Sequence, residues 1–125
     1  MKYKEFLGEV HQKAHLAEVG EAVTATRATL EVLAQRLTED ERANLGAQLP
    51  EEIGLFLAID GEAERFGLEE FYHRVSEKEG VDYPQSVHHA QVVFTVMRDA
   101  ISRGEWEDVQ AQLPAEYLKI WKAGS

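Results

Sequence analysis

Apolar residues recur along this chain at the three- and four-residue spacing that is typical of amphipathic α-helices. The apolar face of a first helix holds Tyr3, Phe6, Leu7, Val10 and Ala14. The matching face of a helix that begins near residue 68 holds Leu68, Phe71, Tyr72 and Val75. Because the opposite faces are polar, we predict that both helices lie on the outside of the fold.

Two further segments, at about residues 20–37 and 84–101, are apolar over more than half of a helical circumference. A helix of that kind must be surrounded by other elements, so we predict that both are central and pack against each other. We expect an approximate two-fold axis to relate them. No run alternates between apolar and polar residues, and the predicted fold class is therefore all-α, a helical bundle.

The second half of the chain repeats the first. The tetrapeptide Ala-Gln-Leu-Pro at 47–50 recurs at 111–114. When the two halves are aligned at this spacing, Leu37 matches Ile101 and Val32 matches Val96. Matches of this kind extend over nearly the whole chain. We predict a single domain over residues 1–125, made of tandem pseudo-symmetric repeats at 1–62 and 63–125. Each repeat is expected to hold two long and two short helices.

Helix start signals occur at the same places in both halves. Thr38 and Glu41, like Ser102 and Glu105, have the spacing of a capping box. In that motif the hydroxyl and the glutamate each bind a backbone amide that the helix leaves free. We therefore predict a helix after Thr38 and another after Ser102. Pro50 and Pro114 suit the first position of the next short helix, where no amide hydrogen is needed.

The residues of these repeats resemble those of a known family. The run from Ala25 to Leu37, the run Ala-Gln-Leu-Pro-Glu-Glu at 47–52, and the segments at 66–71 and 111–114 carry the resemblance. They are similar to a bacterial family named domain of unknown function 2267. The resemblance implies a bacterial source and a duplicated helical fold. It supplies no catalytic residue to carry over to this chain.

Composition narrows the functional classes. The chain has no cysteine, which excludes disulfides, thiolate zinc sites and a cysteine nucleophile. The first residues soon turn polar, with no apolar signal region, and we place the protein in the cytoplasm. The formal net charge is −10, and the lysines and arginines are scattered along the chain. Because phosphate groups bind clustered cations, we predict neither a nucleic acid nor a membrane as partner.

The weak metal candidates are His11 and His15, which stand four residues apart in the first predicted helix. That spacing would place both imidazoles on one helical face, as in some zinc sites. A zinc-protease pattern would need glutamate at position 12, where this chain has Gln12. The alternative is a pair of ordinary surface histidines. We predict no metal site and no cofactor.

Two other residues stand out. His89 falls in the apolar arc of the second central segment, so we expect it to be at least partly buried and hydrogen-bonded. It is either a satisfied core histidine or a pH-sensitive, ligand-facing group near the repeat interface. Trp106 occupies the place of Arg42 in the first repeat. It either packs within the fold or forms an interface with a partner. Trp121 replaces Leu57 and is predicted to be core.

These patterns contain no recognisable catalytic triad, nucleophile elbow or phosphate-binding loop, so we predict no catalytic residues. The leading hypothesis is a non-catalytic protein-interaction or regulatory module that forms a homodimer or binds another protein. The alternative is a protein that binds a metal or a small molecule, and this class includes enzymes. The alternative rests on five histidines among many carboxylates and on pockets expected between the repeats.

Overall fold

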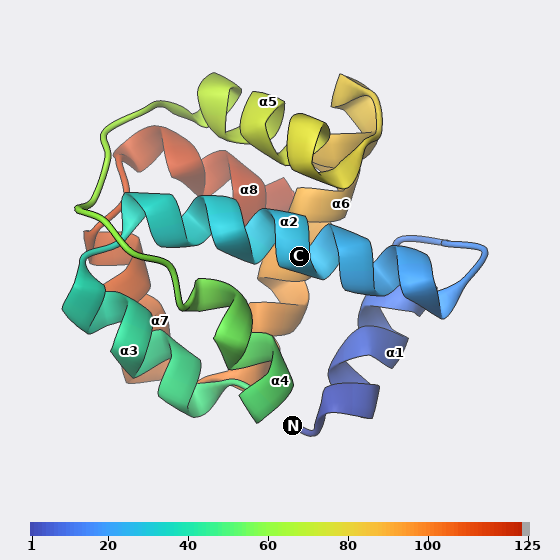
Figure 1. The fold of residues 1–125 in the computed structure, drawn as a ribbon, viewed down its shortest axis with the longest axis horizontal. Coiled ribbons are helices and arrows are strands. Elements are labelled where there is room, and N and C mark those ends of the chain that lie inside the picture. The colour runs from blue at the N-terminus through green and yellow to red at the C-terminus, as the bar shows by residue number, and fades with distance from the viewer. Residues whose placement is uncertain (124–125) are drawn as a thin grey trace.

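The computed structural model describes residues 1–123, and this part of the chain is all helical, as predicted (Figure 1). The helices are α1 Tyr3–Lys13, α2 Val19–Arg36, α3 Glu39–Gln48, α4 Glu51–Gly54, α5 Leu68–Glu79, α6 Tyr83–Ala100, α7 Arg103–Ala111 and α8 Leu118–Ala123, with 3-10 turns at η1 Leu55–Leu57 and η2 Ala115–Tyr117. Four helices lie in each half of the described residues, 11, 18, 10 and 4 residues long in the first half and 12, 18, 9 and 6 residues long in the second. Within the described residues, no helix has the length and apolar character needed to cross a membrane.

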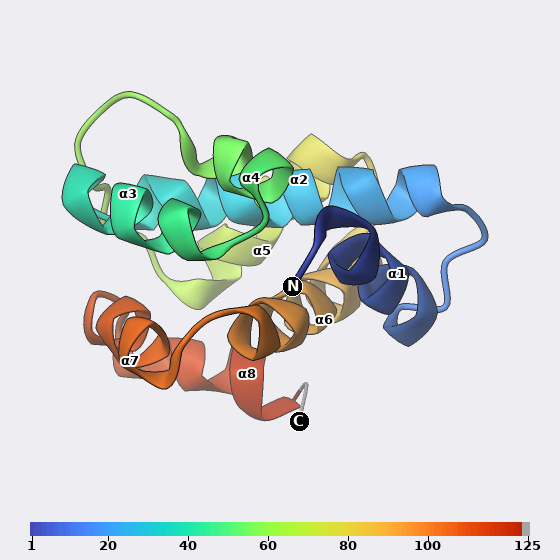
Figure 2. The same ribbon diagram turned by 90° about the horizontal axis from the view of Figure 1, so that it is seen from below.

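The two longest helices, α2 and α6, pack against each other in the middle of the molecule, as their apolar circumference predicts. Helix α1 contacts both of them, and so does α5. Each outer helix therefore covers the central helix of the other half as well as its own. Figure 2 shows α3 and α4 on the side of α2, with α7 and α8 on the side of α6. The division into repeats at 1–62 and 63–125, with its two-fold axis, stays a prediction.

Aromatic side chains fill the core between α5, α6 and the C-terminal helices. Phe71 packs edge-on against Phe94, with ring centroids 5.8 Å apart, and against Tyr117, with centroids 5.6 Å apart. Trp121 stacks on Phe94 and is 6% exposed, as expected of a core residue. Such edge-to-face contacts add to the stability gained by removing the rings from water.

Two buried arginines hold the connection between the halves against the end of α2. Arg42 donates from Nε to the Ala34 carbonyl at 2.7 Å and from Nη1 to the carbonyls of Ile59 and Gly61. Arg36 donates to the Glu64 carbonyl at 2.7 Å. A connecting segment that runs over apolar helices needs partners for its backbone carbonyls. The arginine side chains supply them and fix the path from η1 to α5.

Candidate functional site

The two histidines of the predicted metal pair lie in different local structures. Helix α1 ends at Lys13, and Ala14 forms its C-cap. His15 follows in a turn with a φ angle of 54°, a left-handed conformation that is uncommon for a non-glycine residue. The assumption that His11 and His15 share one helical face is therefore wrong. A metal site on that face has no geometric basis.

His89 is buried, as predicted, and is only 7% exposed. Its Nδ1 atom contacts Oε2 of Glu79, the last residue of α5. The Glu79 side chain is 4% exposed, and its other oxygen, Oε1, is buried without a hydrogen-bond partner. A buried acceptor without a donor is costly and calls for an explanation. His89 therefore has a hydrogen-bond partner in Glu79, whereas the second carboxylate oxygen of Glu79 has none.

His15 and His89 come together at one cavity of about 430 Å³ between the two halves of the chain. One wall is the connection from α1 to α2, and the other is the junction of α5 and α6. The polar lining residues are His15, Glu21, Glu79, Gln85, His88 and His89. Leu16, Val81 and Pro84 are among the apolar ones. This volume lies in the usual range for small-ligand sites, about 300–1,000 Å³.

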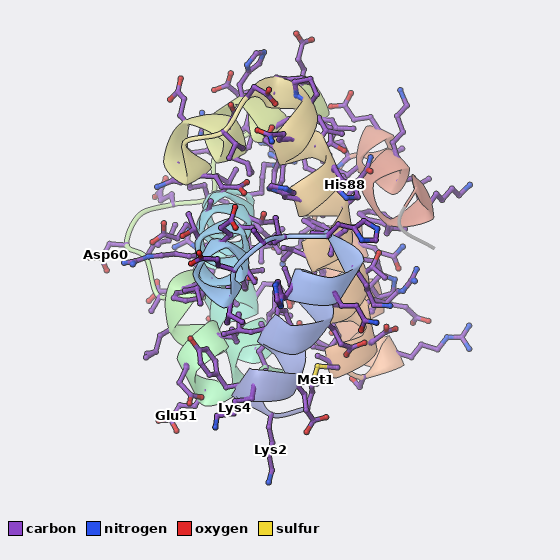
Figure 3. All side chains as sticks on the ribbon, turned by 90° about the vertical axis from the view of Figure 1, so that its right-hand side faces the viewer. Met1, Lys2, Lys4, Glu51, Asp60 and His88 are labelled. Atoms are coloured by element: carbon purple, nitrogen blue, oxygen red, sulfur yellow. The ribbon has the colours of Figure 1, made fainter. Side chains whose placement is uncertain are left out.

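His88 lies on α6 at this cavity, on the side of the molecule that Figure 3 shows. Burial lowers its pKa below the usual 6.5, and the neighbouring His89 and His15 lower it further. The His88 imidazole is therefore neutral at pH 7 and keeps a ring nitrogen that accepts a hydrogen bond. The sequence analysis did not single out His88 as a site residue. It also missed Glu79, because no local pattern links the end of α5 to the middle of α6.

Trp106 is 8% exposed and packs edge-on against Trp121, with ring centroids 5.1 Å apart. The sequence left open whether this residue packs within the fold or meets a partner. Trp106 is therefore part of the hydrophobic core, in contact with Trp121. An interface centred on Trp106 would have little tryptophan surface to use.

The predicted capping boxes are half present. Oγ1 of Thr38 accepts from the Glu41 amide at 3.2 Å, and Oγ of Ser102 accepts from the Glu105 amide at 3.1 Å. Both hydroxyls therefore cap their helices as expected, and α3 and α7 begin directly after them. The hydroxyl half of each box is confirmed.

The other half of each capping box is wrong. The Thr38 amide donates to Oε1 of Gln112 at 3.0 Å, and the Ser102 amide donates to Oε1 of Gln48 at 2.7 Å. These glutamines belong to the duplicated Ala-Gln-Leu-Pro motif, and each one caps a helix of the opposite half. The glutamate of each box is consequently free of the capping role that the sequence assigned to it.

The two capping-box glutamates, Glu41 and Glu105, lie close together between α3 and α7. Glu41 is 5% exposed and Glu105 is 6% exposed, and Oε2 of each is buried without a hydrogen-bond partner. One oxygen from each of Glu41, Glu105 and the exposed Asp108 lies within 4.8 Å of the others. Burial raises the pKa of Glu41 to about 8, and the carboxylates of Glu105 and Asp108 add to this. Among the described residues, this cluster alone gathers three possible metal-ligand atoms so closely.

Comparison with known proteins gives the family of the chain without an activity. No curated protein matches it. The model of one family, described as an uncharacterized conserved protein family, DUF2267, matches residues 3–120. That match spans nearly all of the helical fold and agrees with the resemblance seen in the repeats. The chain belongs to the DUF2267 family of uncharacterized conserved proteins.

Proposed function

We propose that this protein is a non-catalytic binding module with a regulatory role, and that it takes up a primary ammonium group in the histidine-lined cavity. The observation that carries the proposal is Oε1 of Glu79, a buried carboxylate oxygen without a hydrogen-bond donor on a residue that lines the cavity. An ammonium group brings three donors and a positive charge. It would satisfy that oxygen with a charge-assisted hydrogen bond.

The surroundings favour a cation over an anion. Glu21 adds a second carboxylate to the lining, and the neutral His88 accepts a hydrogen bond without opposing the positive charge. The net charge of −10 raises the local concentration of cations around the whole molecule. Leu16, Val81 and Pro84 offer apolar contact for the carbon chain that carries the ammonium group.

The ammonium group has two possible sources, a small alkyl amine or a lysine of a partner protein. The second source would make the cavity a protein-interaction site, in line with the leading hypothesis from sequence, and a second copy of this chain is one such partner. We propose the bacterial cytoplasm as the setting, because the chain lacks cysteine. The scattered lysines and arginines favour partners other than nucleic acids and membranes.

Calorimetric titration tests the proposal, with 1,4-diaminobutane in one arm and a lysine-containing peptide in the other. The same peptide with the lysine acetylated is the control ligand, because acetylation removes the charge. Glu79→Gln should weaken binding about tenfold or more, since it removes the charge that the ammonium group meets. Glu77→Gln, an exposed neighbour on α5, should leave binding unchanged.

The two arms separate the sources. Binding of the diamine alone points to a metabolite-sized ligand, and binding of the peptide alone points to a protein partner. If neither ligand binds, or if Glu79→Gln binds as tightly as the unaltered protein, the cavity is not an ammonium site.

A further inference from the structure

The carboxylates of Glu41 and Glu105 are unusual for the start of a helix, because they are turned inward. A glutamate in the first turn normally faces solvent or binds its own N-cap amide. Here the N-cap amides of α3 and α7 are already occupied by Gln112 and Gln48. The capping role therefore does not explain why Glu41 and Glu105 are buried.

No described cation neutralises this pair. The buried arginine next to Glu41 in the chain, Arg42, directs its Nε and Nη1 atoms to backbone carbonyls. The described salt bridges of the protein involve neither Glu41 nor Glu105. Buried carboxylates in proteins are paired, protonated or bound to a metal ion. Oε2 of each glutamate is buried and without a hydrogen-bond donor, so both oxygens are available as ligands.

We propose that Glu41, Glu105 and Asp108 bind a hard divalent cation, such as Mg²⁺, Mn²⁺ or Ca²⁺, between α3 and α7. The spacing of the oxygens fits one ion. Ligand oxygens on opposite sides of such an ion lie at most roughly 4–5 Å apart, about twice the metal–oxygen distance. The three carboxylates have oxygens within 4.8 Å of one another.

The chemistry of the donors selects the class of ion. Three carboxylates and no imidazole or thiolate favour Mg²⁺, Mn²⁺ and Ca²⁺ over the softer transition metals. Asp108 lies one helical turn after Glu105 and is exposed, so it gives the ion a path from solvent. Water molecules complete the coordination on that open side. The ion joins α3 of the first half to α7 of the second and thereby stabilises the contact between the halves.

Electron paramagnetic resonance of Mn²⁺ measures the binding directly, because the signal of the free aqueous ion falls as the ion is bound. We expect the full chain to bind one Mn²⁺ with a dissociation constant of about 1 mM or tighter. We also expect Mg²⁺ or Ca²⁺ to displace it. Glu105→Gln should weaken the affinity about tenfold or more. Glu41→Gln serves as the second ligand variant, and both should fold, because glutamine keeps the volume and removes a buried charge.

Glu107→Gln is the matched control, since Glu107 lies on the same helix, is exposed and pairs with Arg103 at the surface. It should bind Mn²⁺ as the unaltered protein does. The inference is overturned if the unaltered protein binds no Mn²⁺ at millimolar concentration, or if both ligand variants retain its affinity. Equal loss in the Glu107 variant would also overturn it, because it would indicate general attraction of cations by an acidic protein.

Discussion

Replacing Glu41 by glutamine should change how the stability of the protein depends on pH. Burial, then the facing Glu105 and Asp108, raises the pKa of Glu41 from 4.5 to about 8 in the folded protein. Between these values the native protein holds a proton that the unfolded chain releases. The free energy of unfolding therefore falls as the pH rises through this window. The stabilising contribution is complete below pH 4.5 and is lost above about pH 8.

The size of the effect follows from the shift. At about 1.4 kcal/mol per pKa unit, the full shift corresponds to an upper limit of about 5 kcal/mol. Asp108 is exposed and leaves one side of the cluster open to water, which screens the charges. We therefore expect a fall of about 2 kcal/mol between about pH 5 and pH 8. The amide introduced by Glu41→Gln would carry no charge at any pH and would donate a hydrogen bond to Glu105, so the variant should lose most of this fall.

Urea denaturation followed by circular dichroism, in steps from about pH 5 to pH 8.5, measures the two profiles. A chelator in every buffer removes divalent cations, so the measurement is independent of the proposed metal site. Subtracting one profile from the other isolates the carboxylate, because every other group is common to the two proteins.

The control is Glu39→Gln, a change at an exposed acid in the first turn of the same helix. Its profile should run parallel to that of the unaltered protein. Parallel profiles for the Glu41 variant would refute the reasoning, because they would mean that Glu41 is already ionised in the folded protein at the acidic end of the range. A variant that is less stable than the unaltered protein at the alkaline end would refute it as well.

Four further substitutions test the packing of the fold. Gln48→Ala should lower the free energy of unfolding by about 1 kcal/mol, because the Ser102 amide loses its partner, as urea denaturation will measure. Gly54→Ala should lower the free energy of unfolding by about 2 kcal/mol, since the new Cβ would lie 2.6 Å from a backbone oxygen of α3. Gly8→Ala, in open space on α1, should raise the free energy of unfolding by about 0.5–1 kcal/mol. Trp106→Ala should cost about 3 kcal/mol without changing the molar mass measured by light scattering.

Much of the fold follows from local patterns in the sequence. The wide apolar arcs of α2 and α6 leave only a narrow face for solvent, so their central position is dictated by the need to bury that surface. The starts of α3 and α7 follow from Thr38 and Ser102, whose hydroxyls bind amides three residues away. Both features depend on neighbours within one or two helical turns, which periodicity reports directly.

The cavity depends on contacts that periodicity does not report. His15 was predicted to continue a helix, but the chain turns at Ala14 and carries this residue away from His11. The contact of His89 with Glu79 joins two helices across a sharp turn at Gly80, whose φ angle is 75°. A helical projection of either segment alone places these side chains on unrelated faces. The predicted burial of His89 was nevertheless correct, because it followed from the apolar arc around it.

The capping boxes show why a correct local motif gave an incorrect role. The pattern of hydroxyl and glutamate is present in both halves, and locally nothing competes with the glutamate for the N-cap amide. The competitor lies far along the chain, in the other half, where Gln112 reaches Thr38 and Gln48 reaches Ser102. Duplication of Ala-Gln-Leu-Pro therefore provides two reciprocal caps between the halves. Each glutamine binds the amide that the capping box assigns to a glutamate, and Glu41 and Glu105 lie buried close to each other instead, so the surface that joins the halves also holds two buried carboxyl groups.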